Sequence, residues 1–262
     1  MRITLLQTDI VWEDKQANLK QLEKYLEQLN GQTDLVVLPE MFSTGFSMNS
    51  KILAETIDET TVSLLKEWSQ KYQLALCGSY IAKEKDSKNY NRGFFITPDG
   101  NTSYYDKRHL FRIGKESDFF YAGNKRQIIN FKGFRISLLI CYDLRFPVWS
   151  RNIDDNGYDL LIYVANWPAS RRNVWDILLK ARAIENMSYV CGVNRVGTDG
   201  NEVSYNGGSV LISAKGNILA SVDNDREGFV TKTIDLDSLK HFRDKFPVWK
   251  DADKFALHTS ER

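Results

Sequence analysis

Short apolar segments alternate with amphipathic stretches along most of the chain, a pattern typical of α/β proteins. Residues 3–7 predict a first strand, and leucines at three- and four-residue spacing between residues 19 and 29 predict a helix that ends at Asn30 and Gly31. The apolar run at residues 35–38 predicts a buried strand that Pro39 ends. Glu40 therefore lies where a strand leaves the sheet.

The same alternation continues toward the C-terminus. Further helices are predicted at about residues 61–72 and 174–185, and further strands at residues 74–81, 93–97, 102–105, 136–140, 160–164, 189–193, 209–213, 218–222 and 229–234. The last thirty or so residues indicate a helix and a tail. Because strands in both halves are apolar on both faces, we expect sheets inside and helices outside. No linker or internal repeat divides the chain, so residues 1–262 are expected to form one domain.

Composition and charge exclude several classes of protein. With 42% hydrophobic and 26% charged residues, the 262-residue chain is typical of a globular protein. Its 35 basic and 34 acidic residues leave a net charge of +1, which creates no global field favouring nucleic acid or an anionic membrane. The longest apolar run, at 160–165, is far shorter than the roughly 20 residues of a membrane span. We expect no nucleic-acid partner and no membrane partner.

The chain has three cysteines and three histidines, too few and too scattered for a zinc cluster or a disulfide framework. An odd number of cysteines, with no signal-peptide pattern at the N-terminus, indicates reduced thiols and a cytoplasmic protein. Cys77 and Cys191 lie within apolar strands and are interpreted as small core residues.

Cys141 is the candidate nucleophile. An apolar strand leads directly into it, and polar, turn-prone residues follow in Ile-Cys141-Tyr-Asp-Leu-Arg-Phe-Pro. This pattern predicts a sharp exit toward a short helix, a geometry that exposes a nucleophile beside free backbone N–H groups. The thiol still needs a base or a positive neighbour to form its thiolate.

The histidines fit that role poorly. His241 and His258 lie among charged residues of the C-terminal segment, where a solvated position is expected, so His109 is the only credible imidazole. Lys107 follows a predicted strand and precedes an apolar pair, an arrangement that could hold its ammonium near the sheet edge.

Two carboxylates complete the candidates. Glu40 leaves a buried strand at its carboxyl end, where open α/β sheets place their sites. Buried carboxylates have raised pKa values unless they are paired, and a general base or acid near neutral pH needs such a value. Glu116, in Gly-Lys-Glu-Ser-Asp, would by itself pass as surface charge.

These residues carry a resemblance. Leu-Pro-Glu40, Tyr-Asp-Lys107-Arg-His-Leu-Phe and Ile-Cys141-Tyr-Asp-Leu-Arg-Phe-Pro resemble, in that order, the three signatures of the nitrilase superfamily, the carbon–nitrogen hydrolases. The likeness runs from residue 3 to about residue 230 and includes Val-Ala-Asn166-Trp167-Pro. The tail, Arg-Asp-Lys-Phe-Pro-Val-Trp-Lys-Asp-Ala-Asp, resembles the bacterial omega-amidase branch, the 2-oxoglutaramate amidases.

The resemblance implies a role for each candidate. Cys141 would be the nucleophile, Glu40 the general base and then acid, and Lys107 a stabiliser of the tetrahedral intermediate. Glu116 matches the second glutamate of the family and would orient Glu40 and Lys107 or the substrate. The backbone N–H of Tyr142 would join Lys107 in holding the oxyanion.

The resemblance also implies a four-layer αββα sandwich that forms a homodimer and needs no metal or organic cofactor. The C-terminal tail, about residues 236–262, is expected to pack at a subunit interface. The reaction would be hydrolysis of a terminal amide through a Cys141 thioester.

An omega-amidase must hold a dicarboxylic half-amide, so a cation is needed at the far end of the pocket. Arg145 is the first choice, with a structural pair to Asp143 as the alternative. Trp167 and Phe42 are expected to form the apolar wall, although both are equally well explained as core aromatics.

Three hypotheses follow. The first is an omega-amidase acting on 2-oxoglutaramate or 2-oxosuccinamate. The second is another enzyme of the superfamily, such as a nitrilase, an N-carbamoyl-amine hydrolase or an acyl transferase. The third is a non-catalytic binding protein, against which the intact Glu40, Lys107 and Cys141 count. A histidine-dependent cysteine hydrolase based on His109 is a weaker rival.

Overall fold

The computed structural model describes residues 1–152, 157–253 and 255–257, and two six-stranded sheets dominate it. The first sheet has the order β14 (Gly228–Thr233), β1 (Arg2–Gln7), β2 (Leu35–Val37), β3 (Ala75–Lys83), β4 (Asn89–Ile96) and β5 (Thr102–Asp106). The second has the order β13 (Ile218–Ser221), β12 (Val210–Ile212), β9 (Tyr189–Asn194), β8 (Leu160–Ala165), β7 (Phe134–Ile140) and β6 (Ile129–Phe131). A separate hairpin joins β10 (Val196–Thr198) to β11 (Ser204–Asn206).

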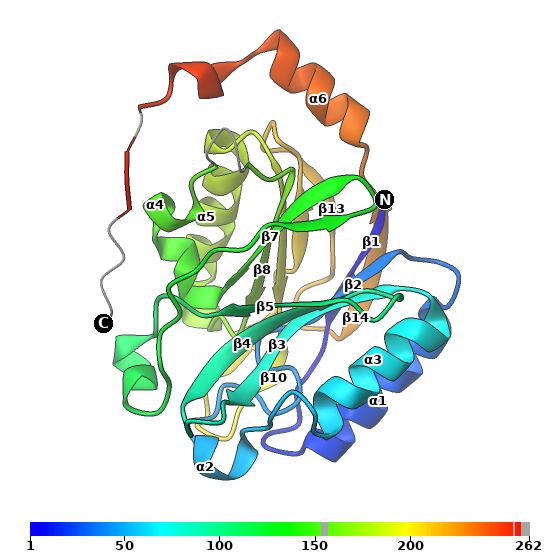
Figure 1. Cartoon of the computed structure of the whole chain (residues 1–262), viewed down its shortest axis with the longest axis vertical. Helices are drawn as coiled ribbons and strands as arrows, with labels where there is room; N and C mark the ends of the chain where they lie inside the picture. The colour runs from blue at the N-terminus through cyan, green and yellow to red at the C-terminus, as the bar shows by residue number, and fades with distance from the viewer. Residues whose placement is uncertain (153–156, 254, 258–262) are drawn as a thin grey trace.

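Helices cover the outer faces of both sheets (Figure 1). α1 (Lys15–Leu29) and α3 (Thr60–Tyr72) lie against the first sheet, and their apolar faces share a buried cluster with its outward-facing side chains. α4 (Pro147–Ser150) and α5 (Arg172–Glu185) lie on the second sheet. The inward-facing side chains of both sheets form one core, in which Leu5, Val37, Leu138 and Ile162 are buried. The expected αββα sandwich is confirmed.

The parallel strands bring the candidate residues to one end of the sandwich. β2 runs parallel to β1 and β3 in the first sheet, and β7, β8 and β9 run parallel in the second. Chain segments that leave the carboxyl ends of such strands meet at the same edge. Glu40 follows β2, Cys141 follows β7 and Asn166 follows β8.

Most predicted elements are present, and those that the pattern missed are short. The prediction did not include β6, β10, β11 and the four-residue helix α2 (Ser50–Leu53), nor the 3-10 turns η1 (Arg112–Gly114), η2 (Glu116–Asp118), η5 (Ala169–Arg171) and η6 (Val248–Asp251). The short helix expected after Cys141 is present as the 3-10 turn η3 (Cys141–Arg145), which α4 follows. Segments of three to five residues contain too few positions for a period of two or 3.6 residues to emerge. Among the described helices, none is both long and apolar enough to cross a membrane.

The C-terminal segment lies at the periphery of the layers (Figure 1). α6 (Leu236–Lys245) buries Leu239, and Arg243 holds the helix against the second sheet through a 2.7 Å ion pair with Asp159. Beyond α6, large apolar side chains such as Phe246 and Trp249 are exposed. The predicted helix and tail are therefore present, and His258 lies outside the described residues.

Candidate active site

A cluster of charged side chains is completely buried where the two sheets meet. The Lys107 ammonium donates to Glu40 Oε1 at 2.8 Å and to Glu116 Oε1 and Oε2 at 3.0 and 2.9 Å. All three side chains are 0% exposed. Burying charges is costly unless each is paired. Here one ammonium lies between two carboxylates, and Lys107, Glu40 and Glu116 together are called the buried charged cluster below.

Asn91, on β4, connects the two carboxylates. Its Nδ2 donates to Glu40 Oε1 at 2.7 Å and to Glu116 Oε1 at 3.1 Å. The Ser79 hydroxyl donates to Asn91 Oδ1 at 3.0 Å while accepting from the Met41 N–H at 2.8 Å. Because the serine proton is directed at Oδ1, the amide of Asn91 is oriented with its NH₂ toward the carboxylates.

Asn166, at the end of β8, holds Glu40 from the second sheet. Its backbone N–H donates to Glu40 Oε2 at 2.8 Å, and its Nδ2 donates to the Glu40 carbonyl at 2.5 Å. Both carboxylate oxygens of Glu40 therefore have donors, one set from each sheet. The orientation of this side chain is determined by the packing of two sheets rather than by its own loop.

Cys141 sits at a sharp turn. It follows β7, begins η3 and has a φ of +44°, a left-handed conformation that is rare for residues other than glycine. Its thiol faces the Asn166 carbonyl at an Sγ–O distance of 3.9 Å, and only 9% of the residue is exposed. The first N–H groups of a helical turn lack partners within the turn, so the Tyr142 amide is available beside the sulfur.

The surroundings of Cys141 favour its neutral form. Burial raises the pKa of the Cys141 thiol well above its usual range, and the charge of Glu40 adds to this rise while Lys107 opposes it. Burial alone would lower the pKa of Lys107, but the charges of Glu116 and Glu40 raise it overall. Burial also raises the pKa of Glu116, against the effect of Lys107. The resting thiol therefore keeps its proton and needs a base during the reaction.

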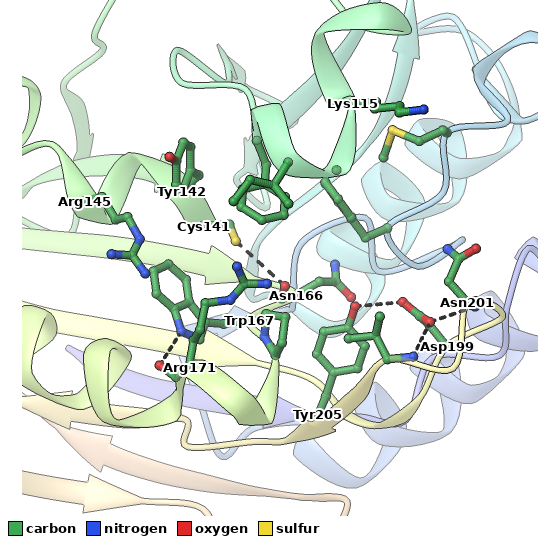
Figure 2. Close-up of a pocket in the computed structure, with 17 residues that line it drawn as sticks. Lys115, Cys141, Tyr142, Arg145, Asn166, Trp167, Arg171, Asp199, Asn201 and Tyr205 are labelled. Atoms are coloured by element: carbon green, nitrogen blue, oxygen red, sulfur yellow. Dashed lines mark hydrogen bonds between the residues drawn. The ribbon is translucent and has the colours of Figure 1, made fainter.

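A cavity of about 380 Å³ opens over Cys141 (Figure 2). Its aromatic wall consists of Phe46, Phe111, Tyr142, Trp167 and Tyr205. Glu40, Lys107 and Glu116 do not line it, since they are buried behind Cys141. A ligand in the cavity can thus reach the Cys141 sulfur but not the buried charged cluster.

Three cations line the same cavity: Lys115, Arg145 and Arg171, which together are called the cationic rim below. The Arg145 guanidinium lies over the Trp167 ring, 5.3 Å from its centroid, and the Arg171 guanidinium lies over the Phe111 ring at 5.0 Å. Lys115 and Arg145 are exposed and Arg171 is half-buried.

Arg145 does not pair with Asp143. The Asp143 carboxylate accepts from the Tyr105 hydroxyl at 2.7 Å and from the Ile140 N–H at 3.0 Å. It also contacts both the backbone N–H and the Nδ1 of His109, at 2.9 and 2.8 Å. Arg145 instead faces the cavity beside Trp167 (Figure 2). The structural alternative for Arg145 is therefore wrong.

The structure corrects the interpretation of Phe42. This ring belongs to the core between the first sheet and its helices, where it packs edge-on against Phe94 with centroids 5.9 Å apart. Phe42 is 5% exposed and does not line the cavity. Its neighbour Met41 has a φ of +44° and lies in a turn, so the chain changes direction between Glu40 and Phe42. Trp167 does line the cavity, as expected.

His109, His241 and the other two cysteines do not line the cavity. His109 stacks on Phe146 with centroids 3.7 Å apart and is held by Asp143, and it is not among the described residues that line the cavity over Cys141. His241 is exposed on α6. Cys77 and Cys191 are fully buried in the core, as predicted for both.

Sequence reasoning missed three residues at the site: Asn91, Asn166 as a ligand of Glu40, and Arg171. Asn91 lies inside a strand in Tyr-Asn-Arg, where no apolar run or turn singles it out. Asn166 belongs to the segment Val-Ala-Asn166-Trp167-Pro, which resembles the family. Its position directly after an apolar strand is the feature that could have identified it as a site residue. Arg171, in Ala-Ser-Arg-Arg, has the pattern of a solvated pair.

The sequence and the fold of this chain are similar to those of known carbon–nitrogen hydrolases. The profile of the carbon–nitrogen hydrolase family matches residues 2–244. The chain is 45% identical to "Omega-amidase YafV" of Escherichia coli (strain K12) over 257 residues, 98% of each protein, and 33% identical to "2-oxoglutaramate amidase" of Bacillus subtilis (strain 168), covering 96% of this chain and 97% of that protein. A solved structure also matches: XC1258 from Xanthomonas campestris, a CN-hydrolase superfamily protein whose crystal structure has an arsenic adduct in the active site. It superposes on this chain with a TM-score of 0.95 at 41% sequence identity, and the match covers 98% of this chain and 99% of that one.

Proposed function

The chain belongs to the carbon–nitrogen hydrolase family, and from that premise we propose that it is an omega-amidase, which hydrolyses the terminal amide of 2-oxoglutaramate or 2-oxosuccinamate. The observation that carries the chemistry is the buried charged cluster behind a cysteine that lines a cavity. The 45% identity to an omega-amidase over almost the whole chain supports the choice of reaction within the family.

Glu40 takes the thiol proton as Cys141 Sγ attacks the carbonyl carbon of the amide. The same carboxyl then gives that proton to the leaving nitrogen, and ammonia departs as the carbon–nitrogen bond breaks. Water enters, loses a proton to Glu40 and attacks the thioester, which releases the dicarboxylate and restores the thiol. Each step uses Glu40 as base or acid, the role that its fixed position beside the thiol supports.

Lys107 and the Tyr142 N–H would stabilise the oxyanion of the tetrahedral intermediate. In the resting protein the Lys107 Nζ donates to three carboxylate oxygens, one of Glu40 and two of Glu116. When Glu40 takes a proton its charge is lost, so Lys107 can turn one N–H toward the new negative charge. Losing a single oxyanion donor costs about 3–4 kcal/mol in other enzymes. Glu116 keeps a second, permanent contact that holds Lys107 in place during this exchange.

Arg145 provides the cation that a half-amide substrate needs. It lines the cavity above Cys141, and Asp143 is fully engaged elsewhere. A guanidinium binds a carboxylate through two parallel N–H donors. Trp167 lies under Arg145 and supplies the apolar wall between the two ends of the substrate.

We further infer a cytoplasmic homodimer. The three cysteines are free, in keeping with a reducing compartment. Exposed apolar side chains beyond α6, including Phe246, Val248 and Trp249, are 59%, 43% and 41% exposed and fit a surface that a second subunit covers. This supports the proposal that the tail packs at a subunit interface.

Ammonia release from a panel of amides tests the function. The panel contains 2-oxoglutaramate, glutamine, an aliphatic nitrile and a carbamoyl amine, with Cys141→Ala as control. We expect the highest kcat/KM on 2-oxoglutaramate and no activity of the control. Faster turnover of the nitrile or the carbamoyl amine would reassign the enzyme within its family. Activity in the control would remove Cys141 from the nucleophile role, and inactivity on the whole panel would favour a binding protein.

A further inference from the structure

Two guanidinium groups of the cationic rim have no carboxylate partner. Neither Arg145, which is exposed, nor Arg171, which is half-buried, forms an ion pair with any described residue, whereas Arg92, Arg172 and Arg182 each do. Both guanidinium groups line the cavity over Cys141. A pair of unmatched cations at one cavity wall is a site for an anionic ligand.

Trp167 connects the two arginines. Its ring supports the Arg145 guanidinium at 5.3 Å, and its Nε1 donates to the Arg171 carbonyl at 2.9 Å. The Trp167 backbone N–H is in turn fixed by Asn194 Oδ1 at 2.7 Å. The guanidinium groups lie on either side of the Trp167 ring in the view of Figure 2. One nearly buried side chain therefore contacts the guanidinium of Arg145 and the backbone of Arg171.

An aromatic ring lies beside each guanidinium group, and neither group donates a hydrogen bond to a described residue. The Arg171 group lies 5.0 Å from the Phe111 centroid, in the same way that Arg145 lies over Trp167. An aromatic ring attracts a guanidinium through the cation–π interaction, which needs no N–H donor to point at a hydrogen-bond acceptor. Neither ring competes for the donors that a ligand would use.

The one acid on the described cavity wall does not offset these cations. The Asp199 carboxylate accepts from the Tyr205 hydroxyl at 2.8 Å and from the backbone N–H groups of Asn201 and Val203 at 2.8 and 3.0 Å. These donors fix the loop that leads to β11, and they use the carboxylate internally. The cavity wall therefore presents an excess of positive charge.

We propose that Arg171 is a specificity-determining residue, which with Arg145 binds the carboxylate and the adjoining 2-oxo oxygen of the substrate. This deepens, and rests on, the omega-amidase function proposed above. A 2-oxo acid presents three acceptor oxygens on adjacent carbons, more than one guanidinium edge can satisfy with two parallel bonds. Two cations also repel the ammonium group of an amino acid such as glutamine, which otherwise has the same length and carboxylate.

The test compares Arg171→Gln with the wild-type enzyme on three five-carbon amides. These are 2-oxoglutaramate, glutaramate, which lacks the oxo oxygen, and pentanamide, which lacks the carboxylate as well. We expect kcat/KM of the variant on 2-oxoglutaramate to fall about 10- to 100-fold, mostly through KM, because charge-assisted hydrogen bonds are lost. The loss on glutaramate is smaller, and pentanamide, which engages neither guanidinium, is unaffected.

Arg112→Gln is the matched control. Arg112 is exposed in η1 next to the cavity-lining residues Phe111 and Ile113, but it does not line the cavity. Its replacement removes the same charge from the same neighbourhood and should leave all three substrates unchanged. A loss equal to that of Arg171→Gln would assign the effect to general electrostatic attraction and overturn the proposal.

The outcomes separate this inference from the proposed function. If Arg171→Gln loses activity equally on all three amides, or on none, Arg171 does not determine specificity, while a wild-type preference for 2-oxoglutaramate keeps the function. If the wild-type enzyme shows no such preference, the proposed function fails. Binding of 2-oxoglutarate to Cys141→Ala, with and without Arg171→Gln, repeats the test by calorimetry without turnover. Weaker binding by at least about tenfold in the double variant supports the proposal, and equal binding overturns it.

Discussion

In the buried charged cluster, Lys107 and both glutamates are 0% exposed, and each charged group has an opposite charge within 3.0 Å. In the cationic rim, by contrast, Arg145 and Arg171 have no carboxylate partner among the described residues and are held by aromatic rings. The two regions meet at one cavity with Cys141 between them. Each charged group of the cluster has an oppositely charged partner before any ligand arrives, while the two rim arginines have none among the described residues.

This difference predicts how the two regions respond to substitution. Removing one member of the buried charged cluster leaves an unmatched charge in the protein interior, which costs stability as well as chemistry. Removing a rim cation leaves no buried charge without its partner, so it should weaken substrate binding and leave the free energy of unfolding unchanged. Burial and ion pairing of the charged side chains therefore distinguish the residues that carry out the reaction from those that select the substrate. The sign of the charge does not distinguish them.

The largest effect is expected from Lys107→Met. The variant leaves Glu40 and Glu116 facing each other without their shared ammonium, so the free energy of unfolding should fall by about 3–5 kcal/mol, and kcat should fall by about a thousandfold. Urea unfolding followed by tryptophan fluorescence and ammonia release measure the two losses. The double variant Lys107→Met/Glu116→Gln should regain part of the stability and none of the activity. A Lys107→Met protein as stable as the wild type would break the comparison.

Asn91→Ala tests the hydrogen bonds that Asn91 donates to the buried charged cluster. The amide of Asn91 opposes the rise in the pKa of Glu116, so its removal raises that pKa further. Because the cluster must be ionised for Glu40 to act as a base, the acid limb of the kcat/KM profile should move to higher pH. At neutral pH we expect a fall in kcat of about tenfold.

Asn89→Ala is the control for that substitution. Asn89 lies on the same strand, and its Nδ2 donates to the Ser50 hydroxyl at 3.1 Å, outside the site. Its replacement should leave the pH profile in place. If both variants lose activity with an unchanged acid limb, Asn91 only supports the strand and does not position the carboxylates.

A smaller effect, confined to binding, is expected from Arg145→Gln. KM for 2-oxoglutaramate should rise about tenfold or more, because a charge-assisted bidentate contact is lost. The free energy of unfolding should stay within about 0.5 kcal/mol of wild type, as for an exposed side chain without a buried partner. A stability loss as large as that of Lys107→Met would show that the rim is structural after all.

The smallest effect on activity is expected from His109→Asn. The imidazole contacts Asp143 and Phe146 rather than the cavity, so activity should remain within about tenfold of wild type, whereas loss of a general base costs about 10²- to 10⁴-fold. Steady-state ammonia release measures this. Complete loss in a folded variant would contradict the role of Glu40 and make His109 the base.

Much of this arrangement could be predicted from the sequence, because each of the proposed catalytic residues comes shortly after an apolar strand. Glu40, Lys107 and Cys141 each stand at a strand end, and parallel strands end together. Strand and helix positions followed from periodicity in the same way. The α/β class came from alternation alone, while the four layers came from the family resemblance.

The parts of the site that could not be predicted depend on side-chain direction and on contacts between residues far apart in the sequence. Phe42 lies two residues from Glu40, but its ring packs into the core between the first sheet and its helices. The turn at Met41 causes this, and the residue types there do not reveal that turn. Asn91 acts across two carboxylates that are 51 and 25 positions away in the sequence. Arg171 looks like one of many solvated arginines until the cavity and the ring of Phe111 are placed beside it.

The most direct test of the central claim is the intact mass of the protein during turnover. The claim is that the buried charged cluster activates Cys141 to form a thioester with an omega-amide. Enzyme mixed with 2-oxoglutaramate and quenched in acid should carry an adduct equal to the substrate less ammonia, mapped to Cys141 and absent from Cys141→Ala. Steady ammonia release with no such adduct on Cys141, or with an adduct on another residue, would contradict the account.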